Sequence, residues 1–344
     1  MSSIFSTLTY AFGQPVAKAQ LKSQPADFQV EEQIAYSLSG EGEHLWLWLE
    51  KEGENTDWVA QQLAKWAGIK LRDVGYAGLK DRQAITRQWF SLYLPGREDP
   101  DLSLFQFENM RILRHTRHQR KLQTGGLSAN RFILTLRAVD GDKTQIETRL
   151  NQIQQQGVPN YFGEQRFGRN EHNLVMAQRL FNGELTRLKP AQRSLYISAA
   201  RSFIFNAVLA ERIRHQAWNQ AWVGDVFQLE GSDKWFVDDG SADLTQRVKL
   251  ADLHPTGAMV GAGELPTQQQ ARELEQAVLA EHQAWCSALA ELGLKQDRRA
   301  LRVMPMDLHW QWLADDVLQL AFTLRPGSYA TMVVREIFNL NDAA

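Results

Sequence analysis

Residues 78–88 read GLKDRQAITRQ and connect two segments, 74–78 and 89–94, that are predicted to be strands. Each segment is a short apolar run bounded by glycine or polar residues, which is typical of a buried strand. In the connection, Asp81 has a cation on each side. Neighbouring positive charge stabilises an ionised carboxylate, so Asp81 is suited to nucleophilic attack or proton abstraction. Residue types alone leave open an alternative, a turn in which Asp81 caps a helix.

Along the rest of the chain, the predicted secondary structure changes from strands to helices and back to strands. Alternation of apolar and polar residues predicts strands at 28–36, 44–50, 132–136, 308–312 and 317–324. Helical spacing predicts helices at 56–68 (with Thr56 as N-cap), 146–153, 171–182, 192–218 and 267–292. The late strands need partners in a sheet, so this order predicts a helical insertion into a strand-rich domain.

Composition fits a soluble globular protein of two domains. The chain has 344 residues, of which 44% are hydrophobic and 23% charged. Its single cysteine, Cys286, permits no internal disulfide and no cysteine-built metal cage, which favours a reducing compartment such as the cytoplasm. The sequence shows neither a signal-peptide pattern nor a membrane-length apolar run, so we expect no membrane association.

The distribution of charge is more informative than its sum. The net charge is -2, yet residues 111–137 contain seven Lys or Arg, two His and no Asp or Glu. The basic residues are Arg111, Arg114, Arg117, Arg120, Lys121, Arg131 and Arg137. Such a run is either an ordinary solvated surface or a strip that faces a polyanion, and the absence of acids favours the strip.

Residues 78–88 resemble the signature of the tRNA pseudouridine synthase D family, Gly-x-Lys-Asp-x-x-Ala-x-Thr-x-Gln. The matching positions are Gly78, Lys80, Asp81, Ala84, Thr86 and Gln88. Residues 22–32 and 159–168 are similar to the family's N-terminal and third motifs, and similarity continues at 130–132, 201–206 and 327–336. The resemblance extends over essentially the whole chain.

That resemblance implies an α+β fold with two parts. One is a pseudouridine-synthase-type catalytic domain with a mixed or antiparallel sheet, expected at 1–155 and 305–344. The other is a mainly helical α/β insertion domain, expected at 156–304. The implied partner is tRNA, no obligatory protein partner is evident, and we expect a monomer.

The resemblance also implies the chemistry. Asp81 attacks C1′ of a uridine or takes a proton from C2′, the glycosidic bond breaks, and the uracil rejoins the ribose through C5. The expected target is the D-arm uridine at position 13 of the tRNA, and no cofactor or metal is implied. A target base must leave the RNA stack to be reached, so an aromatic face is expected beside it.

The residues expected to bind substrate carry over by position. They are Lys22, Phe28, Lys80, Asn130, Phe132, Asn160, Phe162, Gln165, Arg166 and Tyr329. Lys22 is expected to pair with Asp81, and Phe132 to stack on the uracil. Each has an ordinary alternative, because Lys22 could be a solvated lysine and Phe132 a core residue of its strand.

Other functions predict different observations. A binding module without chemistry would not need Asp81, and a nuclease using the acidic residues of 233–243 would need a metal ion. His115 and His118 lack an evident third ligand, so we expect no metal there. The sequence contains neither a P-loop nor a Rossmann glycine motif, so nothing indicates a nucleotide cofactor.

Overall fold

The computed structural model describes residues 8–185 and 187–341, which pack as two compact units. The sheet unit comprises 17–142, 305–327 and 338–341, and the helical unit comprises 8–16, 143–304 and 328–337. The predicted α+β class with a mixed sheet is confirmed. The domain boundaries expected from the sequence, with 143–155 in the catalytic part, stay a prediction. No helix in the described ranges combines the length and apolar character needed to cross a membrane.

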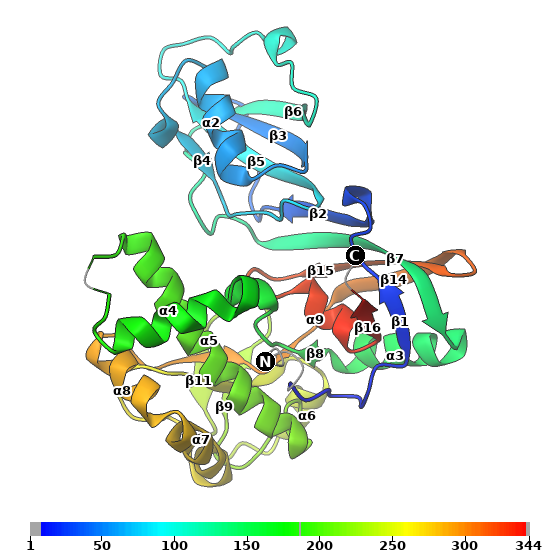
Figure 1. Cartoon of the computed structure of the whole chain (residues 1–344), viewed down its shortest axis with the longest axis vertical. Coiled ribbons are helices and arrows are strands. Elements are labelled where there is room, and N and C mark those ends of the chain that lie inside the picture. Colours follow the sequence, from blue (N-terminus) through cyan, green and yellow to red (C-terminus); the bar gives the residue numbers. More distant parts are fainter. Residues whose placement is uncertain (1–7, 186, 342–344) are drawn as a thin grey trace. The chain divides into compact units, whose positions relative to one another are not determined.

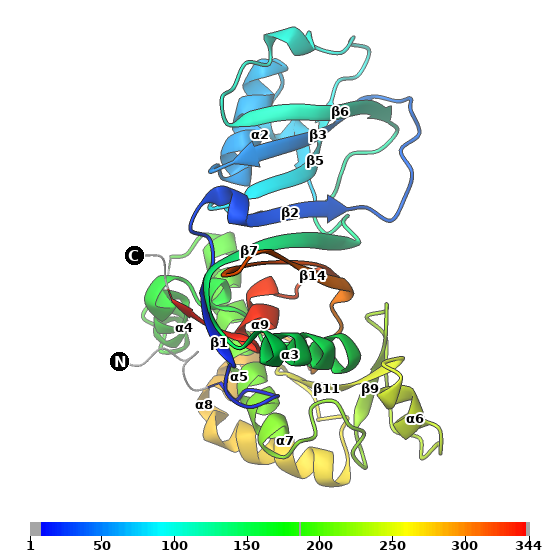
Figure 2. The ribbon, with the colours of Figure 1, turned by 90° about the vertical axis from the view of Figure 1, so that its right-hand side faces the viewer.

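The main sheet follows the order β14-β15-β7-β2-β5-β3-β6, and Figure 2 shows β6, β3, β5, β2 and β7 side by side. Its strands are β2 (Phe28–Gln33), β3 (His44–Glu52), β5 (Ile85–Tyr93), β6 (Met110–His118), β7 (Ala129–Gly141), β14 (Met306–Ala314) and β15 (Val317–Leu324). Short strands join it: β4 (Val74–Tyr76) pairs with β5, while β1 (Ala17–Gln20) pairs with β7 and β16 (Phe338–Asn341). Along the main order, only β2 and β5 are parallel neighbours in the described chain. The expectation that the late strands pair with early ones is confirmed by β15 against β7.

The core of the sheet unit lies between β3, β5 and helix α2 (Thr56–Trp66), and Figure 1 shows α2 against these strands. Strand alternation sends Leu45, Leu47 and Leu49 to the α2 side, where all three are fully buried. The odd and even positions of β3 are both largely covered, as expected from its continuous apolar sequence.

The helical unit is built around the long helix α5 (Pro190–Arg214). Its other helices are α3 (Lys143–Gln156), α4 (His172–Phe181), α6 (Leu244–Lys249), α7 (Gln269–Glu281), α8 (Gln283–Glu291) and α9 (Ala330–Arg335). Its strands are β8 (Val158–Pro159), β9 (Val226–Leu229), β10 (Trp235–Val237), β11 (Leu253–Met259), β12 (Asp297–Ala300) and β13 (Arg302–Val303). Strands β10, β9, β11 and β12 form a second sheet, and β13 pairs with β8. The expected helix at 267–292 is thus two helices, α7 and α8.

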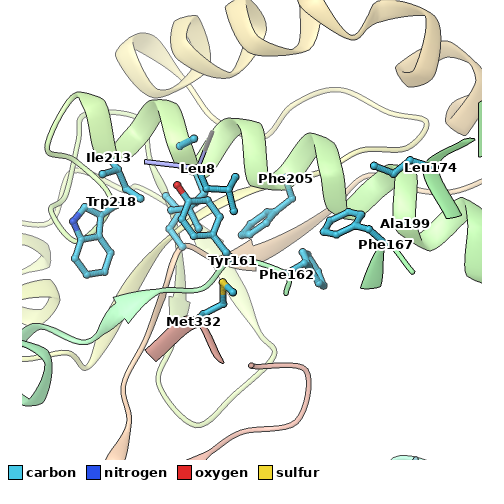
Figure 3. Packing of buried hydrophobic residues seen from close by; sticks show 13 residues of the cluster. Leu8, Tyr161, Phe162, Phe167, Leu174, Ala199, Phe205, Ile213, Trp218 and Met332 are labelled. Carbon is cyan, nitrogen blue, oxygen red and sulfur yellow. The ribbon is translucent and has the colours of Figure 1, made fainter. Parts of the chain in front are cut away.

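An aromatic cluster occupies the centre of the helical unit (Figure 3). Phe205 on α5 is fully buried and meets Phe162 edge-on, with 5.5 Å between the ring centroids. Tyr161 beside it is 1% exposed, and Met332 of α9 belongs to the same cluster. The third motif seen in the sequence, 159–168, is therefore anchored in a core through Tyr161, Phe162 and Phe167.

We predict that Leu47→Ala lowers the free energy of unfolding of the sheet unit by about 2–5 kcal/mol, because it leaves a cavity under α2. The control is Leu313→Ala. Leu313 on β14 is 51% exposed, so this variant should change the free energy of unfolding by less than about 0.5 kcal/mol. Urea unfolding followed by tryptophan fluorescence measures both. Equal losses in the two variants would contradict the assignment of Leu47 to the core.

Candidate active site

Asp81 lies on the loop 77–84, between β4 and β5. Its Oδ2 is 3.2 Å from Nζ of Lys22, and the two side chains are 26% and 22% exposed. Lys22 has a φ of 63°, a conformation that costs free energy for a residue other than glycine. The expected ion pair between Lys22 and Asp81 is therefore present, in a partly exposed position that a ligand can reach.

Aromatic side chains lie beside this ion pair. Nζ of Lys22 is 4.0 Å from the centroid of the Phe28 ring, and Phe28 meets Phe132 edge-on at 6.1 Å. Phe132 stacks on Phe322 of β15 at 5.8 Å and is 9% exposed. The core role considered for Phe132 is thus real, and the three rings form an apolar wall next to a carboxylate.

The side chain of Lys80 turns inward to a carboxylate. Its Nζ is 2.7 Å from Oε2 of Glu32, and the side chains are 6% and 0% exposed. The other oxygen of Glu32 accepts a hydrogen bond from the backbone N–H of Trp89, at 3.2 Å. Lys80 was expected to bind substrate, but its position favours a different role, that of holding the loop against β2.

The loop is also fixed through the first residue of α2. Oγ1 of Thr56 accepts a hydrogen bond from the backbone N–H of Lys80 at 3.0 Å and donates one to Oε1 of Gln88 at 3.1 Å. Nε2 of Gln88 in turn donates to the carbonyl of Gly78 at 3.2 Å. The prediction of Thr56 as N-cap was wrong, because Asn55 holds that position and the Thr56 hydroxyl serves the loop instead.

Lys51, which the sequence analysis did not single out, reaches the same loop from β3. The residue is fully buried, and its Nζ donates to the backbone carbonyls of Glu54 at 2.7 Å and Asp81 at 3.0 Å. Burial lowers the pKa of Lys51 to about 8, an effect that the negative charge of Asp81 opposes. In the sequence, the only indication that Lys51 is buried was its place after three leucines of a predicted strand.

Two buried polar atoms near the loop make no hydrogen bond within the described chain: Oδ1 of Asn130 and Oγ1 of Thr86. Asn130 faces Glu32 across the pairing of β7 with β2, and Thr86 faces Val30 across the pairing of β2 with β5. A buried acceptor without a partner costs about 1–3 kcal/mol. Asn130 was expected to hydrogen-bond Asp81 or the uridine, and its Oδ1, unpaired in the described chain, is an acceptor of the kind that the N–H of a base needs.

In the helical unit, the remaining expected residues gather around Phe162. Nε of Arg166 donates to the hydroxyl of Tyr329 at 3.2 Å, and the guanidinium of Arg166 is 5.3 Å from the centroid of the Phe162 ring. The Phe162 and Tyr329 rings meet edge-on at 6.2 Å. Gln165 is exposed on the short helix Glu164–Arg166. The structure thus brings Tyr329 against Phe162 and Arg166, which lie far from it in the sequence.

Arg299 completes this group and was missed by the sequence analysis. Its guanidinium is 4.0 Å from the centroid of Phe162, and Nη2 donates to Oδ1 of Asn160 at 2.7 Å. Burial lowers the pKa of Arg299 to about 10. An arginine in a charged segment just after a helix carries no signal of burial in the sequence, so only the packing identifies it.

Comparison with known proteins assigns the family. The family model described as tRNA pseudouridine synthase D (TruD) matches residues 5–184 and 171–337. The chain is 57% identical over 335 residues to the tRNA pseudouridine synthase D of Hydrogenovibrio crunogenus, with 97% of each chain covered. The chain belongs to the TruD family of tRNA pseudouridine synthases. It is also 45% identical to the Proteus mirabilis member over 337 residues, covering 97% of this chain and 96% of that one.

A solved structure shows that the TruD fold extends over the chain. A TruD structure from Methanosarcina mazei superposes with a TM-score of 0.74 at 22% identity, covering 97% of this chain and 96% of that one. At this identity the comparison concerns the fold alone. Within the described part of this TruD chain, no three His, Cys, Asp or Glu side chains converge as metal ligands.

We predict that Glu32→Gln destabilises the sheet unit by about 3–5 kcal/mol, because it leaves the ammonium of Lys80 buried without its carboxylate. The matched control is Glu31→Gln, one residue away, whose 25% exposed side chain pairs with Arg87 and should contribute less than about 1 kcal/mol. Urea unfolding of both variants measures the difference. A smaller loss for Glu32→Gln than for its neighbour would show that the buried pair does not hold the loop.

Proposed function

We propose that this TruD-family chain isomerises uridine to pseudouridine in tRNA with Asp81 as its catalytic carboxylate. The observation that carries the proposal is the position of Asp81, partly exposed, paired with Lys22 and bordered by the ring of Phe28. A carboxylate held by a cation in reach of solvent is available as nucleophile or base.

The reaction balances without an outside reagent. Asp81 attacks C1′ or removes the proton from C2′, and the bond between N1 of uracil and C1′ breaks. The uracil turns and its C5 forms a bond to C1′; on the first route this displaces the Asp81 oxygen from C1′, and on the second Asp81 returns the proton to C2′. C5 then loses its proton and N1 gains one. Atoms and oxidation state are unchanged overall, so this chain's residues need only to bind, orient and move protons. Lys22 keeps the carboxylate charged and directed, since opposite charges attract at hydrogen-bonding distance.

Asn130, Phe28 and Phe132 are proposed to receive the uracil. The oxygen of Asn130, which has no partner in the described chain, can accept an N–H of the base. Phe132 is 9% exposed, so it is proposed to border the base with part of its ring while the rest remains in the core. Phe28 lies under Lys22 and closes the apolar side.

The helical unit is proposed to contact the RNA through Asn160, Phe162, Gln165, Arg166 and Tyr329. Arg166 carries a guanidinium that can bind phosphate while its contact with Tyr329 orients it. The finer parts of the proposal come from the sequence. The resemblance gives the D-arm uridine at position 13 as target, a monomer is the expected active form, and the single cysteine favours the cytoplasm as its compartment.

The basic run 111–137 does not form the continuous strip expected from the sequence. Its members lie on β6, on β7 and on the connection between these strands, and β6 and β7 lie apart in the main sheet with β3, β5 and β2 between them. Several members also pair with carboxylates: Arg111 with Glu50, Arg117 with Asp99, Arg131 with Glu31, and Arg137 with Asp27. Arg114 and Arg120 have no carboxylate partner in the described chain, so we propose these two for phosphate contacts.

We predict that Arg120→Ala weakens tRNA binding and lowers the slope of log affinity against log salt by about 1, as expected for one lost phosphate contact. The control Arg111→Ala should have a smaller effect, because Glu50 already balances its charge. Filter binding of tRNA at several salt concentrations measures both. Equal effects in the two variants would show that carboxylate pairing does not decide which cations bind RNA.

We predict that Asp81→Asn abolishes pseudouridine formation on unmodified tRNA while tRNA binding persists under identical salt, because the amide keeps the shape but cannot act as nucleophile or base. The control Glu52→Gln removes a charge from an exposed residue of β3 and should leave conversion unchanged. If neither wild type nor Asp81→Asn converts uridine although both bind, the chain acts as a binding module. If both convert it, another residue is the catalytic carboxylate.

A further inference from the structure

The burial of Lys51 costs free energy, and packing at its position on β3 does not require a charged residue. It stands on β3 at the point where the strand leaves the α2 core, with 0% of its surface exposed. Fully buried lysines are rare, because removing an ammonium from water is expensive unless its hydrogen bonds are replaced. A methionine of similar length would fill the same space without that cost.

The contacts of Lys51 join the turn after β3 to the loop that carries Asp81. Its two acceptors in the described chain are backbone carbonyls, that of Glu54 in the turn after β3 and that of Asp81 itself. The ammonium thus bridges the turn and the loop at the residue whose side chain is proposed to react. A bond to the carbonyl fixes the peptide of Asp81, while Lys22 contacts its carboxylate.

The same turn and loop share further bonds that leave Asp81 little freedom. Nε of Arg82 donates to the carbonyl of Gly53 at 3.0 Å, and the N–H of Lys80 donates to Thr56. These bonds hold the residues before and after Asp81, and Lys51 holds Asp81 itself. Removing Lys51 therefore releases the centre of the loop while its ends stay anchored.

We propose that Lys51 is a positioning residue that fixes the backbone of Asp81 for reaction, an inference that rests on the proposed function. Placement of a reacting group matters because an error of about 1 Å can cost about 100-fold in rate. Lys51 does not contact the RNA, since it is fully buried. Its loss should therefore reduce kcat and leave KM for tRNA nearly unchanged.

The charge of Lys51 supplies a second test. The charged groups that act on it are Asp81, Lys80 and Glu54, and burial is the largest influence, which brings its pKa to about 8. Between about 8 and the ordinary value of 10.5 the unfolded chain binds this proton and the folded chain does not. Stability from this group therefore rises with pH across that window. Loss of the ammonium weakens its bonds to the carbonyls, so kcat should fall across the same window.

The experiment compares wild type, Lys51→Met and the control Lys65→Met, a lysine exposed on α2, on an unmodified tRNA transcript. We expect Lys51→Met to lower kcat by about 10- to 100-fold, with KM within about twofold, at a temperature where the melting curve shows the variant to be folded. We expect the control to match wild type. The decline of kcat above pH 8 should be seen in wild type and absent from Lys51→Met.

Lys51→Gln keeps an N–H donor without the charge and replaces Lys51→Met if the latter does not fold. An intermediate kcat with unchanged KM supports the proposal. A folded Lys51 variant with wild-type kcat, or one whose activity falls only in proportion to its folded fraction, overturns it. If wild type itself converts no uridine, the proposed function fails. If wild type and the Lys51 variant convert uridine at the same rate, the proposed function stands and only the role of Lys51 is overturned.

Discussion

The arrangement depends on the attachment of one loop to a turn. After Lys51 and Glu52, the last two residues of β3, the chain turns through Gly53 and begins α2 at Thr56. Residues on both sides of this turn donate to or accept from the loop that carries Asp81. A polar loop over a hydrophobic core would leave its backbone groups unsatisfied, which is costly. Here each end and the centre of the loop find a partner, so a partly exposed carboxylate is held by buried bonds.

That attachment also explains the distribution of charge around Asp81. Lys80, Lys51 and Lys22 all approach the loop, but only Lys22 meets the carboxylate in a partly exposed pair. Lys80 is neutralised by Glu32 in the interior, and Lys51 serves backbone carbonyls. Three lysines thus act on different parts of the loop. Lys80, which belongs to the motif, and Lys51, which the sequence did not indicate, both hold the loop in place.

The sequence predicted the class of fold, most elements and the Lys22–Asp81 pair, because these depend on local periodicity and on a motif of specific residues. It could not show that Lys80 is buried instead of facing a ligand, because the burial of Lys80 depends on its ion pair with Glu32 on another strand. It missed Arg299, whose partners Asn160 and Phe162 lie far away in the chain. The basic run 111–137 failed as a strip because neighbours in sequence separate when β6 and β7 take distant places in the sheet.

The pairing of β15 with β7 has a consequence for the way the chain reaches its native state. Leu136 and Leu318 are partners in the sheet, yet the helical unit is translated between them. Until the last part of the chain leaves the ribosome, β7 has one edge without its final neighbour, and an unpaired strand edge is a template for association with other chains. Closing so long a loop is slow compared with local pairing. The nascent protein therefore has a period of exposure to aggregation that ends only when the antiparallel pair of β14 and β15 docks on β7.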